Sequence, residues 1–179
     1  SPDRRGIDCA LLYQSNKLDL LSMKPNEVNL NGRKTRDILS ATFTHLDDTF
    51  SIYVNHWPSR YGGRKKSNSK REIAAKTLLK LMDSTYKDNP NYKIIAMGDF
   101  NDEPLDSSLL NFTNYSNRSL ELKGTIKYQG KWQIFDQFIC SKNFEYKLMV
   151  YRADFVLEED KPYGGSKPYR TYYGPFYNG

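Results

Sequence analysis

The sequence predicts one mixed α/β domain in which much of the sheet is antiparallel. Apolar runs of strand length recur along the chain, and several are separated only by a short polar turn. One long segment in the middle has helical periodicity and lies between two such runs, as a crossover helix does. With 179 residues, 38% of them hydrophobic, the chain is long enough to bury a core as a single domain over residues 1–179.

The first third of the chain predicts two pairs of strands. Residues 6–13 (GIDCALLY) are expected to form a buried strand, with residues 18–23 as a candidate hairpin partner. Residues 37–45 and 50–56 are expected to form the second pair, joined by a polar turn. One face of the last strand carries alternating side chains that end in a histidine: Phe50, Ile52, Val54 and His56.

Residues 70–86 are expected to form the clearest helix of the chain. Ser69 is placed to cap its first turn, Glu72 lies three residues further on, and the apolar residues recur at helical spacing. The helix is expected to end before Asn89, because Pro90 follows. The remaining elements are expected in the order strand, short helix, strand and strand, at residues 92–97, 107–112, 132–140 and 146–151.

Lys and Arg outnumber Asp and Glu by 27 to 21, which gives a formal net charge of +6. This excess favours polyanionic partners such as nucleic acid or anionic lipid headgroups, although it serves solubility equally well. A basic stretch within residues 64–71 can follow a nucleic-acid backbone or bind a phosphoinositide headgroup. No apolar run approaches the roughly 18 residues of a membrane span. The two cysteines, Cys9 and Cys140, lie in apolar runs and are expected to be buried free thiols.

The motif GDFND (residues 98–102) follows an apolar strand. Alternation along the chain places Asp99 and Asn101 on the same side and turns Phe100 into the core. A carboxylate beside a carboxamide suits Mg²⁺, which prefers few hard oxygen ligands completed by water and phosphate. The alternative is a polar turn, since glycine, aspartate and asparagine are all turn formers.

The motif NHWPSR (residues 55–60) also follows a strand. His56 can donate a proton to a leaving oxygen, because an imidazole titrates near neutral pH. Arg60 can grip a phosphate through two parallel contacts. A lone histidine is, however, more often structural than catalytic.

Two carboxylates lie inside apolar runs, Asp136 in IFDQFIC and Asp8 in GIDCALLY. An ionised side chain in such a place loses hydration and needs a partner. That partner is either a basic residue of a structural salt bridge or a catalytic imidazole that the carboxylate orients. Arg36 stands directly before one predicted strand, and Arg4 and Arg5 stand before another.

Taken in order, these motifs resemble the endonuclease/exonuclease/phosphatase family, whose members include deoxyribonuclease I. The resemblance extends from Arg4 to about Gly179; GDFND is its most specific part, followed by NHWPSR and IFDQFIC. It implies a four-layer α/β sandwich, in which two facing mixed β-sheets are flanked by helices. It also implies hydrolysis of phosphate esters, of the phosphodiesterase or nuclease type, that depends on Mg²⁺ or Mn²⁺.

The resemblance assigns a role to individual residues of this sequence. Asp99 and Asn101 match metal and phosphate ligands, and His56 matches the histidine that acts as general acid. Asp136 matches the carboxylate that steadies a second histidine, and Asp8 is assigned as the partner of His56. Contact with the phosphate of the substrate is assigned to Arg5, Arg36, Asn55 and Arg60.

Two family motifs have no counterpart in the sequence. The family places a metal-binding glutamate on an early strand, and it ends with a Ser-Asp-His strand that supplies a further carboxylate and histidine. We therefore expect a fragment that lacks terminal strands and has little or no turnover by itself. The alternative is a basic module that binds nucleic acid or a protein partner without hydrolysing anything.

Overall fold

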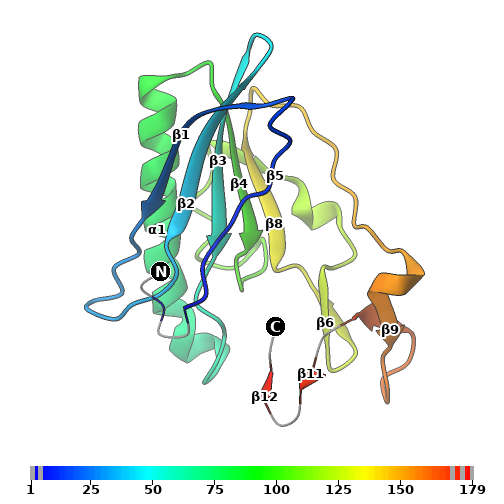
Figure 1. Ribbon diagram of the computed structural model, residues 1–179. Helices are drawn as coiled ribbons and strands as arrows, with labels where there is room; N and C mark the ends of the chain where they lie inside the picture. Colours follow the sequence, from blue (N-terminus) through cyan, green and yellow to red (C-terminus); the bar gives the residue numbers. More distant parts are fainter. Residues whose placement is uncertain (1–2, 4–5, 170–171, 174–175, 178–179) are drawn as a thin grey trace.

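A computed structural model describes residues 3, 6–169, 172–173 and 176–177 of the chain, and its centre is a six-stranded mixed sheet (Figure 1). The strand order is β1-β2-β3-β4-β8-β5. Only β3 and β4 are parallel, and the other neighbours are antiparallel. The predicted α/β class with much antiparallel sheet is confirmed. The strands of this sheet are β1 (Asp19–Asn26), β2 (Ile38–His45), β3 (Asp48–His56), β4 (Lys93–Asp99), β5 (Tyr115–Asn117) and β8 (Asp136–Ser141).

The single long helix, α1 (Arg64–Asp88), connects the two parallel strands and covers one face of the sheet (Figure 1). Parallel neighbours require such a crossover, because a tight turn cannot join them. The helix begins before the predicted Ser69 cap, directly after Gly63, so the basic stretch forms its first turns instead of a loop. Its buried side chains face the sheet at helical spacing: Ser67, Arg71, Ala74, Ala75, Leu78 and Met82.

Strand β3 alternates as predicted, and its fully buried face is the one opposite Phe50, Ile52, Val54 and His56. Ser51, Tyr53 and Asn55 are buried on the side of the helix. The Tyr53 hydroxyl lies 2.6 Å from Oγ1 of Thr85 in α1, so this face of β3 is directed towards the helix. The side chains that alternate with them, including Phe50 and His56, are only half-buried on the other face.

Residues 6–13 do not form the predicted strand. They run as an irregular segment that is largely exposed, and the ring of Tyr13 packs on Phe43 with centroids 4.8 Å apart. Strand β1 pairs with β2 instead, so the edge of β2 is already occupied. Cys9 is half-buried in this segment and Cys140 is buried in β8; both thiols are free.

Three further predicted elements differ in the structure. Residues 107–112 form successive turns, and residues 146–151 have no strand. The predicted strand over residues 132–140 is divided, because residues 134–135 leave the ladder and the Phe135 carbonyl accepts a bond from the Phe100 N–H. Asp136 consequently opens β8 and does not lie in the middle of a strand.

Short hairpins lie beyond the end of the sheet at which β3 and β4 finish (Figure 1). The pairs are β6 (Ile126–Tyr128) with β7 (Lys131–Gln133), β9 (Leu157–Glu159) with β10 (Ser166–Pro168), and β11 (Tyr172–Tyr173) with β12 (Phe176–Tyr177). Two single-turn helices complete the elements, η1 (Arg118–Glu121) and η2 (Asp154–Val156). The family resemblance implies two large facing sheets, and the described residues form one of them. Within the same residues, no helix has the length and apolar character needed to cross a membrane.

Candidate functional site

Three polar side chains form a row across neighbouring strands at one end of the sheet. His56 is the last residue of β3 and stands opposite Asp99, the last residue of β4. Asp99 in turn stands opposite Asp136, the first residue of β8. Neighbouring strands lie about 4.8 Å apart, so the three Cα positions are contiguous. The two predicted motifs and the predicted carboxylate therefore meet at one edge.

The row is accessible to a ligand yet partly shielded from water. The side chains of His56 and Asp99 are 38% and 35% exposed, and His56 Nε2 lies 3.8 Å from Asp99 Oδ2. Loss of hydration and the neighbouring charge of Asp99 raise the pKa of Asp136 above its ordinary value. Two carboxylates this close repel each other, so the row favours binding of a cation.

Glycine is required near the end of β4 because the neighbouring strand leaves no room for a side chain. Gly98 pairs with Asn55 of β3 and has φ +127°, and a Cβ at Gly98 would lie 2.0 Å from the Asn55 carbonyl oxygen. The side chain is absent because the neighbouring backbone fills its place. Beyond it, Phe100 is fully buried as predicted, with its ring 4.8 Å from that of Trp57.

Asn101 is held next to Asp99 by an unusual backbone conformation. It has a left-handed φ of 50°, which asparagine tolerates better than most residues. Its backbone N–H donates to Asp99 Oδ1 at 2.8 Å, and its side-chain Nδ2 donates to the Trp57 carbonyl at 3.0 Å. The second bond sets the direction of the carboxamide, whose oxygen is the atom suited to a cation.

Arg60 joins the two motifs and does not project into solvent. Its Nε donates to the Asn101 carbonyl at 2.8 Å, and its guanidinium stacks on the Phe135 ring at 4.4 Å. One terminal nitrogen bonds Asp106 at 2.6 Å and Asp102 at 3.3 Å. These contacts give Arg60 a positioning role, and the phosphate contact predicted for it stays a prediction.

A buried charge network beneath the row was not predicted from the sequence. Arg71 Nε lies 2.7 Å from Asp102 Oδ1, and both side chains are completely buried. Ser108 donates to the other oxygen of Asp102, and Gln137 donates to its carbonyl. The sequence indicates this network only through the density of acidic residues in GDFNDEPLD. Two of these acidic residues, Asp102 and Asp106, are buried.

Asp106 belongs to the same network. Burial alone would raise the pKa of its carboxyl, but the bond from the Glu103 N–H and the charges of Arg64 and Arg60 outweigh this and lower it. Asp106 is therefore an ionised partner that ties the loop after GDFND to α1 and to NHWPSR.

The other predicted residues lie near the row in supporting positions. Arg36 is buried, donates to the His56 and Trp57 carbonyls at 2.9 Å each, and lies 3.2 Å from Asp3. Asn55 is buried on the helix side, where it bonds the Tyr53 carbonyl and the Trp57 indole. The phosphate contacts predicted for Arg36 and Asn55 stay predictions.

Asp8 is exposed on the irregular N-terminal segment, next to the end of β3. The Asp8 carboxylate accepts a hydrogen bond from the Cys9 N–H. The thiol of Cys9 contacts the His56 backbone, and this contact lowers the pKa of the thiol, although burial raises it overall. This places Asp8 at the correct edge for the predicted pairing with His56, which stays a prediction. Arg5 lies outside the described residues.

The oxygen atoms at this edge have the chemistry that Mg²⁺ or Mn²⁺ prefers. Asp99 and Asp136 offer carboxylates, and Asn101 offers a carboxamide oxygen. Across the part of the chain that is described, no group of three or more His, Cys, Asp or Glu side chains is arranged as a metal site. A divalent cation would fit here with few protein ligands, completed by water and phosphate.

Comparisons with known proteins show the family and the fold of the chain. The family model described as Endonuclease/Exonuclease/phosphatase family matches residues 1–179. No curated protein sequence matches the chain. Among solved structures, the human Nocturnin catalytic domain with a bound sulfate anion has a TM-score of 0.60 at 19% identity, over 73% of this chain and 50% of that one.

Two other similar structures carry functional names. The Bacteroides thetaiotaomicron mannosyl-6-phosphatase has a TM-score of 0.55 at 17% identity, over 73% of this chain and 55% of that one. TDP2 of D. rerio complexed with a single-strand DNA product has a TM-score of 0.52 at 13% identity, over 71% and 54%. The matched part of this chain thus spans about half the length of these structures, and identities this low show the fold alone. Because the family model covers the chain from end to end, the chain belongs to the endonuclease/exonuclease/phosphatase family.

Proposed function

We propose that the chain carries the hydrolytic centre of a metal-dependent phosphoesterase of the phosphodiesterase or nuclease type. The observation that supports this most is the row of His56, Asp99 and Asp136 on three adjacent strands. A purely structural role does not explain why two carboxylates and an imidazole meet at a partly exposed edge, where their charges are costly.

Each residue of the row has a proposed task. Asp99, Asp136 and the carboxamide oxygen of Asn101 would hold Mg²⁺ or Mn²⁺, and the bound ion would neutralise the charge that develops on the phosphoryl oxygens. His56 protonates the departing oxygen when water attacks phosphorus. Asp99, 3.8 Å from the His56 ring, keeps that ring in place. Arg36 and Arg60 support the loops that follow, through the backbone carbonyls they bind.

The surroundings favour a substrate with more than one negative charge. A hollow of about 170 Å³ next to NHWPSR is lined by the basic side chains of Arg33, Lys34 and Lys70, and by Arg36 in its ion pair with Asp3. Such a hollow suits a nucleic-acid backbone or a phosphoinositide headgroup. The similar structures support a phosphate-ester substrate, since one is a mannosyl-6-phosphatase and one is bound to a single-strand DNA product.

We also propose that residues 1–179 turn over slowly. Among the described residues, the row and the adjacent Asn101 together supply two carboxylates and one neutral oxygen. Mg²⁺ retains its waters unless carboxylate charge compensates. Weak metal binding keeps the fraction of loaded enzyme low at ordinary metal concentrations. Slow hydrolysis that rises with added Mn²⁺ is the expected behaviour, and rapid turnover at low metal concentration would contradict it.

The test is hydrolysis of bis(p-nitrophenyl) phosphate with Mg²⁺ or Mn²⁺. We expect Asp99→Asn and His56→Gln each to reduce the rate about 10²-fold or more, the usual contribution of an acid–base group. Asp47→Asn, in the exposed turn between β2 and β3, is the matched control and should leave the rate unchanged. Binding of Mn²⁺, followed by its paramagnetic signal, should weaken in Asp99→Asn and not in the control.

The same variants separate hydrolysis from simple binding. If the chain is instead a basic binding module, Asp99→Ala should keep or raise its affinity for nucleic acid, since negative charge has been removed, and no metal-dependent hydrolysis should be found in the unsubstituted chain. Unchanged hydrolysis in both Asp99→Asn and His56→Gln would reject the proposed site.

A further inference from the structure

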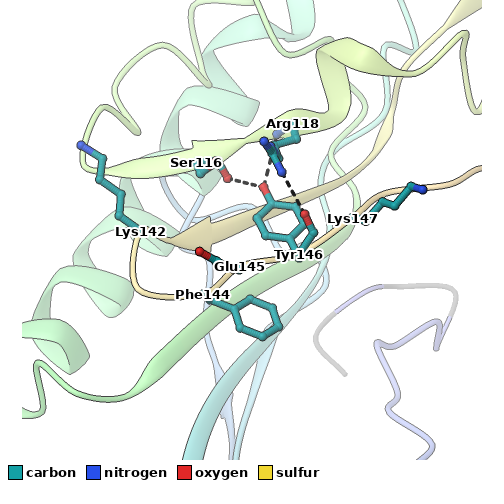
Figure 2. Close-up of a pocket in the computed structure, with 7 residues that line it drawn as sticks. All are labelled: Ser116, Arg118, Lys142, Phe144, Glu145, Tyr146 and Lys147. Carbon is teal, nitrogen blue, oxygen red and sulfur yellow. Dashed lines mark hydrogen bonds between the residues drawn. The ribbon is translucent and has the colours of Figure 1, made fainter.

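A second hollow lies at the other end of β8, away from the row. It has a volume of about 630 Å³ and is open to solvent. Its walls are β5, η1 and the loop of residues 142–147 that follows β8 (Figure 2). Strand β8 begins at Asp136 in the row and ends at Ser141 beside this hollow, a distance of about 17 Å along an extended strand.

Two aromatic rings in this hollow are held nearly parallel. The centroids of Phe144 and Tyr146 are 5.9 Å apart, with an angle of 15° between the ring planes. Phe50 packs edge-on to Phe144 at 6.1 Å, which supports the pair from the sheet. Rings fixed in this way offer an apolar stacking surface without the entropic cost of ordering them on binding.

Hydrogen bonds anchor the Tyr146 side of the pair (Figure 2). The Tyr146 hydroxyl donates to the Ser116 carbonyl at 2.8 Å, and the Arg118 backbone N–H donates to the same hydroxyl oxygen at 3.3 Å. The Arg118 guanidinium donates to the Tyr146 carbonyl at 3.0 Å. The loop is therefore fastened to β5 and η1 on both sides of the tyrosine.

Positive charge surrounds the rings. Lys142 and Lys147 extend to opposite sides of the pair in Figure 2, and within the described residues neither is in an ion pair. Arg118 is 52% exposed and lies 3.5 Å from Glu121. Among the described residues that line the hollow, Glu145 is the one acidic side chain, against Lys142, Lys147 and Arg118, which is shared with Glu121. The charge thus favours an anion, and the rings favour an anion that carries a planar group.

We propose that this hollow is a non-catalytic binding site for single-stranded nucleic acid. A base stacks on the Phe144–Tyr146 pair, and the adjacent phosphates contact Lys142, Lys147 and Arg118. A free phosphate or a lipid headgroup would use the cations but has no need of the rings. Because binding here involves no chemistry at the row, the proposal stands or falls independently of the hydrolytic function.

The test measures binding of a fluorescent oligodeoxythymidine of about 12 nucleotides by anisotropy, in EDTA so that metal-dependent hydrolysis is absent. The double variant Lys142→Glu/Lys147→Glu should weaken binding about tenfold or more. Lys76→Glu/Lys80→Glu, on the exposed face of α1, makes the same change of charge elsewhere and is the matched control. We expect at most a two- to threefold effect from it, through the net charge alone.

The stacking part of the proposal is tested separately with Phe144→Leu, which keeps an apolar side chain at this position. Affinity for the oligonucleotide should fall at least about fivefold, as for loss of one base–aromatic contact. Circular dichroism confirms that the variant is folded. Affinity for inorganic polyphosphate should not change, because polyphosphate has no base to stack.

Three results would overturn the proposal. One is an equal loss of affinity in the two charge-reversal pairs, which would indicate general attraction to a basic protein. Another is unchanged oligonucleotide binding in folded Phe144→Leu. The third is binding to phosphatidylserine vesicles that is lost in Lys142→Glu/Lys147→Glu while oligonucleotide binding is unaffected, which would assign the hollow to a membrane surface.

Discussion

Asp136 stands opposite Asp99 in the antiparallel pairing of β8 with β4, so two carboxylates face each other at the end of the sheet. Reduced hydration and the charge of Asp99 together raise the pKa of Asp136. Folding alone does not benefit from this arrangement, because each carboxylate disfavours the other. The repulsion is the feature that a divalent cation would relieve.

Replacing Asp136 by Asn should therefore stabilise the metal-free protein while weakening metal binding. In EDTA at neutral pH we expect a rise in Tm of about 1–3 °C, since the repulsion with Asp99 is removed. Affinity for Mn²⁺ should fall in the same variant. Differential scanning calorimetry and Mn²⁺ titration check the two effects. A lower Tm in EDTA would mean that the Asp136 carboxylate makes a net favourable interaction.

Gly98→Ala should be strongly destabilising, because the new Cβ would lie 2.0 Å from the Asn55 carbonyl oxygen. We expect a loss of about 2–4 kcal/mol in the free energy of unfolding, from the clash and the unfavourable φ together. Gly32→Ala is the control, since its φ is +82° but nothing lies within 4 Å of the added Cβ. That change should cost only about 1 kcal/mol. Urea unfolding of both variants separates the clash from the backbone strain.

Asp106→Asn should reduce stability in a pH-dependent way. The folded-state pKa of Asp106 lies below its ordinary value, because the effect of burial is outweighed by the Glu103 N–H, Arg64 and Arg60. The carboxylate therefore stabilises the fold above about pH 4, and this contribution disappears as the pH falls through the folded-state pKa. At pH 7 we expect the variant to lose about 2 kcal/mol.

The control for this prediction is the pH dependence itself. Urea midpoints of the unsubstituted protein and Asp106→Asn should converge as the pH falls towards 3. A constant difference between them at all pH values would show that the charge of Asp106 is not the stabilising feature.

The two thiols should differ in reactivity. Burial raises the pKa of Cys140 to about 12, whereas Cys9 is half-buried with a pKa that is also raised, chiefly by burial. Because the thiolate is the reactive form, Cys140 should be modified at least about tenfold more slowly than Cys9 by iodoacetamide at pH 8. Peptide mass spectrometry over time distinguishes the two sites, and equal rates in the folded protein would contradict the burial of Cys140.

The placement of the row could be predicted from the sequence, because it depends on local patterns. The apolar strands that end in His56 and Asp99 flank a helix, and parallel strands joined by a crossover finish at the same edge. Alternation then sets the side of each residue, as the complete burial of Phe100 confirms. Asp136 stands out in the sequence as a charge in an apolar run, although its strand begins later than expected.

The roles of the arginines could not be predicted in the same way. A sequence shows that Arg60 is charged and near a motif, but its guanidinium is directed by Asp102 and Asp106, which reach it only through the tertiary fold. The strand predicted at residues 6–13 failed for a related reason. The apolar pattern of residues 6–13 does not show that the edge of β2 is already paired with β1.

The parallel pairing of β3 with β4 across the 25-residue helix α1 also determines when the row can exist during synthesis. His56 meets Asp99 only after the crossover has been translated and has packed, and Asp136 joins only when β8 has left the ribosome. Contacts this distant along the polypeptide form late and slowly. A nascent chain therefore has no assembled row until the polypeptide as far as β8 has emerged.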